Sequence, residues 1–518
     1  MQKWTQANNQ FSGYDMPTEY LQQIADTNSW GAIYPELILG CMALGLLMLE
    51  VLLPKFAHGA IPRISILGQL LLLGYLVFFD PSGCCSGTFF GGMIELSPTG
   101  QVFRIFFLLA SLFVSYLAMV SFENKSVARV EYFVIVLVIT GALSLMVQSN
   151  HFVMLFVALE TATVGFYVLV SYFRTSSLSL EAGLKYLVMG ALSSGLLLFG
   201  IVLLYGAGSN PVLEASSAES LNFDNLKLFL EANPDNKLAL MGMLLVIAGV
   251  AFKIGAFPFQ IWVPDVYQGA PLPTTALLSV SSKAAGFAVL LVLVDLFEPL
   301  SAWLMPLLSG VAGLTILFGN FAALTQRNLK RLIGLSGVSH AGFLLMGVVA
   351  AQSVAWATGA ILFYLFSYLL ASMAVFAVLA HLGKENDAEI TLDDLGDLAK
   401  KNGFLGFALA VGIGSLAGIP PLAGFVGKFL IFVAAFQAEL YGLLIAGIIG
   451  VVVSIYYYFG VIKNAFFEPF RFSDDEEEEA SEPGALLTCL GRIAILVAVV
   501  GSVALGLFQG PLGAWFER

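Results

Sequence analysis

Long apolar stretches dominate this chain and leave it few possible folds. Fourteen of them are long enough to cross about 30 Å of hydrocarbon, and glycine or proline interrupts some of them. In lipid the backbone N–H and C=O groups cannot pair with water, so segments of this length must be helices. Apolar residues make up 58% of the 518, and charged residues only 11%. The sequence therefore predicts an all-α integral membrane protein with about 14 transmembrane helices.

The basic residues are unevenly distributed between the connecting loops. Most lysines and arginines outside the apolar stretches follow the odd-numbered stretches, and the positive-inside rule assigns those loops to the cytoplasm. Both termini then lie on the non-cytoplasmic side, which agrees with an even number of helices. The first thirty residues lack the basic region and cleavage site of a signal peptide, so we expect a polar tail followed by a membrane anchor.

Two polar features give little functional information. The acidic run "DDEEEEASE" at 474–482 predicts a solvated loop, with a docking site for a basic partner subunit as the alternative. It supplies much of the net charge of −12, so that charge does not bear on nucleic acid, and no nucleic-acid partner is expected. Cys84 and Cys85 are adjacent in a loop and are interpreted as ordinary thiols, with a vicinal disulfide as the alternative. No cysteine spacing predicts a zinc, iron–sulfur or haem site.

Several ionisable residues lie well inside the apolar stretches. A lysine or acid at a helix centre costs about 2.5–3.5 kcal/mol on insertion scales, so these side chains should face the protein interior. A poorly solvated lysine can take and release a proton, and a buried glutamate can control it through its charge. We therefore predict an ion pathway, whose candidate residues are Glu160, Lys253, Lys283 and Lys428.

Each candidate also has a simpler interpretation. Glu160 with Lys253 could be a purely structural ion pair. His340, inside the tenth stretch, could be a hydrogen-bonded interior histidine or a member of the pathway. Lys185, near the cytoplasmic end of the sixth stretch, could extend its ammonium group to the membrane surface or join the pathway.

Two of the predicted helices are broken at matching positions. Pro258 follows Lys253 in the seventh, whereas Pro420 and Pro421 precede Lys428 in the twelfth. Comparing helices four to eight with nine to thirteen predicts two inverted five-helix repeats, in which paired broken helices indicate a transport site. The predicted divisions are 1–128 for the tail and helices one to three, 129–298 and 299–464 for the repeats, and 465–518 for the acidic loop and helix fourteen.

The broken segments resemble a known family. "AFKIGAFPFQIWVPDVYQGAPLPTTALLSVSSKAA" and "LAGIPPLAGFVGKF" are similar to the broken-helix signatures of the antiporter-like subunits of respiratory complex I, and the resemblance extends over the whole chain. The family's functional residues correspond to Glu160 on the fifth helix, Lys253 on the seventh, Lys283 on the eighth and Lys428 on the twelfth. Gln260 is a departure, because many relatives have histidine there.

The resemblance implies a proton-translocating membrane subunit of an NADH:quinone oxidoreductase, in which Glu160 switches Lys253 by pairing with it. It implies no redox centre in this chain, with NADH, FMN, iron–sulfur clusters and quinone bound by partner subunits. The expected surroundings are other complex I membrane subunits and the lipid of a bacterial inner membrane. Two alternatives remain open: a subunit of a multisubunit cation/proton antiporter or membrane-bound hydrogenase, and a purely structural membrane subunit.

Overall fold

The computed structural model describes residues 28–53, 59–78, 87–122, 129–217, 219–382, 387–467 and 489–510. In these residues, twelve helices are long and apolar enough to cross a membrane. Two shorter apolar helices, α18 (Gly403–Ala417) and α19 (Ala423–Gln437), follow one another as an interrupted span, and α21 (Cys489–Leu507) is a further short helix. The prediction of an all-α membrane protein with about 14 spans is confirmed. The acidic run 474–482 and the residues Cys84 and Cys85 lie outside the described residues.

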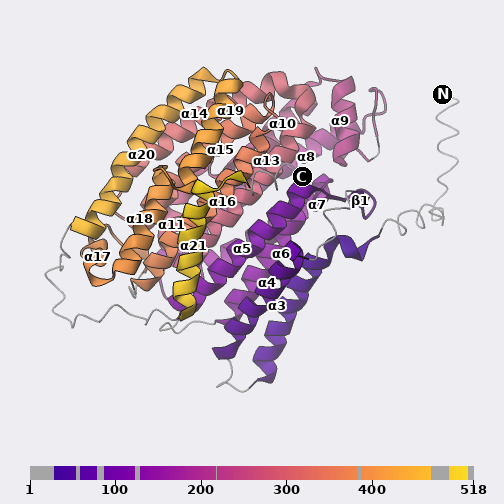
Figure 1. The fold of residues 1–518 in the computed structure, drawn as a ribbon. Helices are drawn as coiled ribbons and strands as arrows, with labels where there is room; N and C mark the ends of the chain where they lie inside the picture. The colour runs from indigo at the N-terminus through magenta and orange to yellow at the C-terminus, as the bar shows by residue number, and fades with distance from the viewer. Residues whose placement is uncertain are drawn as a thin grey trace.

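The first two membrane helices lie at one edge of the bundle, in the indigo and purple part of Figure 1, and the third packs between them and the middle of the bundle. A buried ion pair joins the first to the third: Arg104 Nε lies 2.8 Å from Glu36 Oε1, and Arg104 Nη2 donates to the Ala32 carbonyl at 2.7 Å. Both charges are thus paired inside the protein, as burial requires. The elements are η1 (Trp30–Ile33), α3 (Tyr34–Leu52), α4 (Ile61–Phe78), the hairpin of β1 (Gly87–Phe89) and β2 (Ile94–Leu96), and α5 (Pro98–Ser121).

The next five spans include the first interrupted helix. A short helix, α9, lies in the loop between the sixth and seventh spans, and a π-helical turn, η5, interrupts the eighth span immediately before Lys283. The elements are α6 (Val130–Val147), α7 (Phe152–Val170), α8 (Ser177–Gly208), α9 (Phe223–Ala232), α10 (Lys237–Ile254), η4 (Phe259–Trp262), α11 (Val263–Gly269), α12 (Leu272–Leu277), η5 (Leu278–Ser282) and α13 (Lys283–Leu296).

The following spans contain the centre of the protein. The most apolar parts of α15 and α16 are completely buried, and Figure 1 shows both helices enclosed by others. The side chains in these apolar parts of the two helices are therefore enclosed by the protein. The elements are η6 (Glu298–Leu300), α14 (Ser301–Ala323), α15 (Leu329–Ala351), α16 (Ala357–His381), η7 (Asp387–Glu389), η8 (Asp393–Leu395), α17 (Leu398–Lys401), then α18, α19 and α20 (Tyr441–Phe467).

The two interrupted helices end in the same way at their breaks. α10 is followed by Gly255 with φ of 70°, and α18 by Gly418 with φ of 84°, a left-handed conformation that glycine adopts most easily. A proline follows each glycine within a few residues and prevents the helix from continuing. The predicted breaks in the seventh and twelfth spans are therefore present.

Candidate functional site

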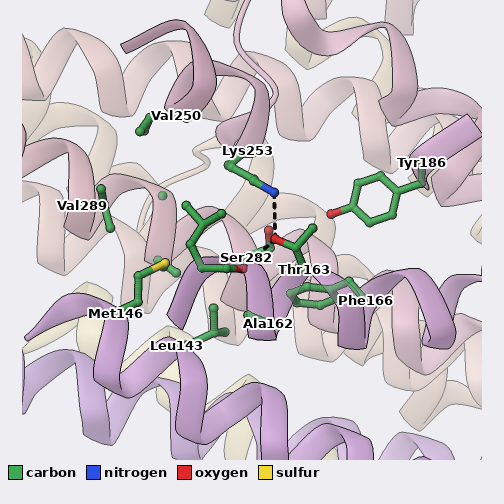
Figure 2. A pocket seen from close by; sticks show the side chains of 13 residues that line it. Leu143, Met146, Ala162, Thr163, Phe166, Tyr186, Val250, Lys253, Ser282 and Val289 are labelled. Atoms are coloured by element: carbon green, nitrogen blue, oxygen red, sulfur yellow. Dashed lines mark hydrogen bonds between the residues drawn. The ribbon is translucent and has the colours of Figure 1, made fainter. Parts of the chain in front are cut away.

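Lys253 lies in the last turn of α10, directly before the break. Its Nζ donates a hydrogen bond of 2.7 Å to Thr163 Oγ1 on α7, as Figure 2 shows. The surrounding pocket is mostly apolar and is lined also by Tyr186 on α8 and by Ser282, the residue before Lys283. The helix end favours a cation there, because its carbonyl groups carry the negative end of the helix dipole.

Glu160 does not pair with Lys253 in this structure. It lies one helical turn before Thr163 on α7, and its Oε1 accepts a short hydrogen bond from Ser194 Oγ on α8. In this conformation the two side chains are apart, as in the separated state of the expected switch, and the paired state stays a prediction. The Lys253 ammonium group binds Thr163, whereas the Glu160 carboxylate, one turn away along α7, is held by Ser194 on α8. Residues three apart lie on the same helix face, so the carboxylate remains beside the lysine pocket.

Lys283 begins α13, and the π-turn η5 directly precedes it. Its side chain is buried, and its Nζ has no hydrogen-bond partner among the described residues. The Nζ lies 5.4 Å from the centre of the Tyr368 ring on α16, a distance at which the ring face attracts a cation. Single-turn π segments are frequent at functional sites, and sequence periodicity gives no sign of them.

His340 lies on α15, and phenol groups contact both of its ring nitrogens. Nδ1 is hydrogen-bonded to Tyr364 Oη on α16 at 2.5 Å, and Nε2 to Tyr458 Oη on α20 at 3.0 Å. The Tyr368 ring, which faces Lys283, lies 5.0 Å from the imidazole ring, centre to centre. A histidine with a partner on each nitrogen can receive a proton on one side and release one on the other.

Lys428 lies on α19 and reaches back across the break to α18. Its Nζ donates to the carbonyl oxygens of Leu416 at 2.7 Å and Ala417 at 3.1 Å, which have no continuing helix to bind. The Nζ of Lys428 also lies 5.4 Å from the centre of the Phe343 ring. Phe343 is on α15, three residues after His340. The broken helix thus supplies both the partners for this cation and the negative end of a helix dipole.

We call seven of these side chains the central polar chain: the half-buried Lys253 and the buried Lys283, Tyr368, His340, Tyr364, Tyr458 and Lys428. Sequence reasoning did not identify its three tyrosines. Polar tips inside apolar helices could have suggested them, and Tyr364 and Tyr368 are spaced to share one face of α16. Gln260 is buried near the first break, and its Oε1 has no hydrogen-bond partner among the described residues.

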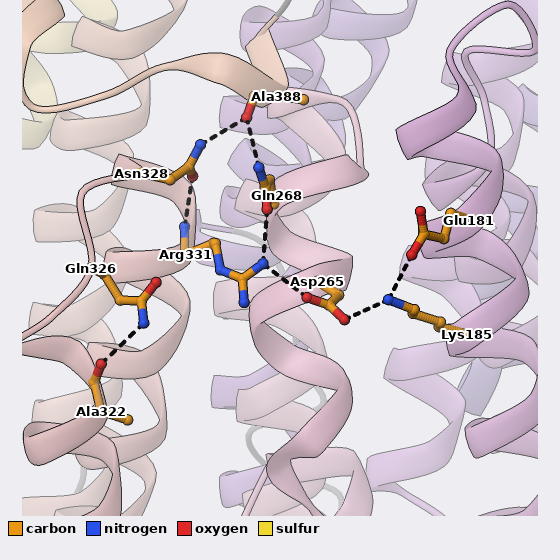
Figure 3. A network of polar contacts seen from close by, with 9 residues as sticks. All are labelled: Glu181, Lys185, Asp265, Gln268, Ala322, Gln326, Asn328, Arg331 and Ala388. Carbon is orange, nitrogen blue, oxygen red and sulfur yellow. Dashed lines mark hydrogen bonds and ion pairs between the residues drawn. The ribbon is translucent and has the colours of Figure 1, made fainter.

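Lys185 lies outside the central polar chain. Its side chain is 44% exposed, and its Nζ forms ion pairs of 2.7 Å with Glu181 and with Asp265. Figure 3 shows that Asp265 on α11 also binds Arg331 on α15, at 2.9 Å. The structure therefore places this lysine in a network of exposed charges. This position favours the interpretation in which its ammonium group extends to the membrane surface. The part of the chain that the structure describes contains no group of His, Cys, Asp and Glu that could hold a metal ion.

Comparison with known proteins gives matches over almost the whole chain. A family model described as NADH:quinone oxidoreductase/Mrp antiporter, TM, matches residues 149–454. NADH-quinone oxidoreductase subunit N 1 of Opitutus terrae is 57% identical over 505 residues, covering 96% of this chain and 99% of the relative. NADH-quinone oxidoreductase subunit N 1 of Rhizobium meliloti is 35% identical, and the match covers 93% of this chain and 96% of the relative. A chain in the structure of respiratory complex I from Thermus thermophilus with bound Aureothin is 31% identical, with a TM-score of 0.76. The match covers 93% of this chain and 98% of that chain.

Proposed function

The chain belongs to the family of NADH:quinone oxidoreductase and Mrp antiporter transmembrane subunits, and we propose that its central polar chain is the route along which it moves protons. It is a proton-pumping membrane subunit of an NADH-quinone oxidoreductase, and its partners are the other membrane subunits of complex I. The observation that supports the route is the link from Lys283 on α13 through Tyr368 on α16 to His340 on α15, because all three side chains are buried in the protein interior.

The proposed path runs along the membrane before it leaves. Protons enter from the cytoplasm near the seventh and eighth helices and reach Lys253. Ser282 in the lysine pocket adjoins Lys283, so the next carrier is one residue away along the chain. From Lys283 the proton passes beside Tyr368 to His340 and on to Lys428, from which it leaves on the opposite side. Buried water would bridge the gaps between these groups, as it commonly does between buried polar side chains.

Glu160 acts in this proposal as the switch of the first carrier. In the conformation described here, Glu160 accepts from Ser194 and Lys253 donates to Thr163. A change of partners that brings the carboxylate to the ammonium group would favour protonated Lys253, and the return to Ser194 would favour release of the proton. The two conformations differ in side-chain partners on three neighbouring helices, α7, α8 and α10, and require no unfolding.

The energy comes from outside this chain in our proposal. The sequence has no dinucleotide-binding fingerprint and no cysteine spacing typical of iron–sulfur clusters. We assign NADH, FMN, the iron–sulfur clusters and quinone to partner subunits, where quinone reduction drives the pumping. We also assign the chain to the bacterial inner membrane, with both termini on the non-cytoplasmic side and with 129–298 and 299–464 as the inverted repeats.

Replacement of the first carrier tests this function. In complexes reconstituted into vesicles, Lys253→Ala is expected to lower proton uptake per NADH oxidised much more than it lowers the amount of assembled complex. Lys237→Ala is the matched control, because Lys237 is exposed at the other end of the same helix. Unchanged pumping by assembled Lys253→Ala complexes would exclude the proposed role of this lysine.

The alternatives make different predictions in the same assay. A structural subunit would lose assembly when a buried charge is neutralised, yet each assembled complex would pump normally. A cation/proton antiporter or hydrogenase subunit would not couple proton uptake to NADH oxidation. The identity of 57% to an NADH-quinone oxidoreductase subunit over almost the whole chain favours the NADH-driven function.

A further inference from the structure

We propose that Asp265 is a positioning residue that ties the second half of the broken seventh helix to both halves of the protein and thereby sets the surroundings of Lys253. The inference rests on the proposed proton route, whose first carrier is Lys253. We call Asp265, Lys185 and Arg331 the Asp265 latch. It lies at the end of the bundle that the distribution of basic residues assigns to the cytoplasm.

The Asp265 carboxylate uses its two oxygens for two different parts of the protein. Oδ2 accepts from Lys185 on α8, in the first group of five spans, at 2.7 Å. Oδ1 accepts from Arg331 on α15, in the second group, at 2.9 Å, and the same Arg331 nitrogen also reaches Gln268 Oε1 at 2.9 Å. In Figure 3, α11 accordingly lies between its two partners and is held from both sides.

A short series of contacts leads from the latch to the lysine pocket. Trp262 lies three residues before Asp265, and its Nε1 donates at 3.2 Å to the carbonyl of Phe252, the residue before Lys253. The Trp262 ring packs 4.9 Å from the ring of Tyr186, which lines the Lys253 pocket and follows Lys185 on α8. Both ends of the Lys185–Asp265 pair are therefore connected to the wall of the pocket.

The ion pairs of the latch are exposed enough to respond to salt. The side chains of Lys185, Asp265 and Arg331 are 44%, 35% and 32% exposed and line a pocket together with Glu181 and Gln268. Ion pairs with this exposure are weak and are screened by salt. The Arg104–Glu36 pair, with side chains 1% and 4% exposed, is by contrast shielded from solvent and salt.

The test uses the whole complex in vesicles, with proton uptake per NADH oxidised as the readout. Asp265→Asn is expected to lower this ratio, and Asp265→Glu to restore most of it, because the charge that binds both cations returns. Lys185→Met should cause a smaller loss, since Arg331 still holds the carboxylate. Lys227→Met is the matched control: Lys227 bridges Asp295 at 3.0 Å and Glu298 at 3.1 Å in a comparable exposed network between α9 and the end of the eighth span.

Salt provides a second readout that a purely structural contact would not share. Raising the ionic strength on the latch side should lower the ratio of the unmodified complex towards that of Asp265→Asn and change the variant little. A ratio for assembled Asp265→Asn equal to that of the unmodified complex would overturn the proposal. Loss of assembly without loss of the ratio in Asp265→Asn, Asp265→Glu and Lys185→Met would also overturn it, because the residue would then be structural.

Lys253→Ala measured in parallel separates the two proposals. A low ratio for Lys253→Ala beside a normal ratio for Asp265→Asn refutes the latch and leaves the proton route standing. A normal ratio for assembled Lys253→Ala refutes the proton route itself. If Asp265→Asn does not assemble, the test uses Lys185→Met and the salt series on the unmodified complex. A ratio of proton uptake to NADH oxidised that neither Lys185→Met nor salt changes would refute the latch.

Discussion

Lys253 Nζ donates its hydrogen bond to Thr163, one helical turn beyond Glu160 on the same helix. The lysine and the glutamate thus face the same region without pairing, and each has a neutral hydroxyl as its partner. A modest change of side-chain conformation would exchange these partners, and the first prediction follows from this arrangement.

Replacement of the glutamate should affect pumping according to charge. Glu160→Gln removes the charge that is proposed to stabilise protonated Lys253, so proton uptake per NADH should fall sharply. Glu160→Asp keeps the charge on a shorter side chain and should retain part of the activity. Proton uptake per NADH is measured for both variants in reconstituted complexes. Equal uptake by Glu160→Gln and Glu160→Asp would contradict the proposed role of Glu160 as a switch.

At Lys428, structural and proton-carrying roles can be separated by arginine. Lys428→Arg keeps a cation beside the carbonyl groups of Leu416 and Ala417, so the complex should assemble. Arginine stays protonated in proteins, so it cannot release a proton, and pumping should be lost. The measurements are the yield of assembled complex and proton uptake per NADH. An arginine variant that pumps normally would show that this position needs only a positive charge.

The tyrosines around His340 should matter for proton transfer. Tyr458→Phe removes the hydroxyl that contacts His340 Nε2 and leaves the ring, so pumping should decrease while the helix packing is kept. Tyr456→Phe is the matched control, because Tyr456 is on the same helix and is 75% exposed. Equal proton uptake by the two variants would remove Tyr458 from the proposed route.

The start of α7, the helix that carries Glu160, should loosen in acid. His151 Nδ1 accepts from the Val153 N–H at 3.1 Å and can do so only when that nitrogen is unprotonated. Burial lowers the pKa of His151 from its ordinary value, and Glu219 opposes this shift. Since the folded form binds its proton less readily than the unfolded form, this cap is fully stabilising above about pH 6.5 and is lost as the pH falls through the lower folded-state pKa.

Amide hydrogen exchange at the first residues of α7 checks this expectation after correction for the intrinsic rate. His151→Asn provides the control, because asparagine caps helices without titrating in this range. Exchange that rises in acid to the same extent in both proteins would assign the effect to another group.

Local features of the sequence determined the spans, the breaks and the buried charges. Hydropathy identifies a membrane helix without reference to its neighbours, and the helix-stopping effects of Gly255 with Pro258 and of Gly418 with Pro420 act within a few residues. The cost of placing Lys253, Lys283 or Lys428 in lipid is likewise a property of one side chain and its depth. These features were therefore readable before any contact was known.

Only the tertiary structure decided which groups meet. Whether Lys253 contacts Glu160 or Thr163 depends on the level at which α7 packs beside α10, because the two candidates share one face of α7 and differ by one helical turn. Lys185 lies in the exposed network because it binds the carboxylate of Asp265, which is 80 residues later in the sequence. The link of His340 to Tyr364 and Tyr458 joins three helices. Partner choice depends on the packing of helices distant in sequence, and apolar patterns of nearly uniform hydrophobicity do not encode that packing locally.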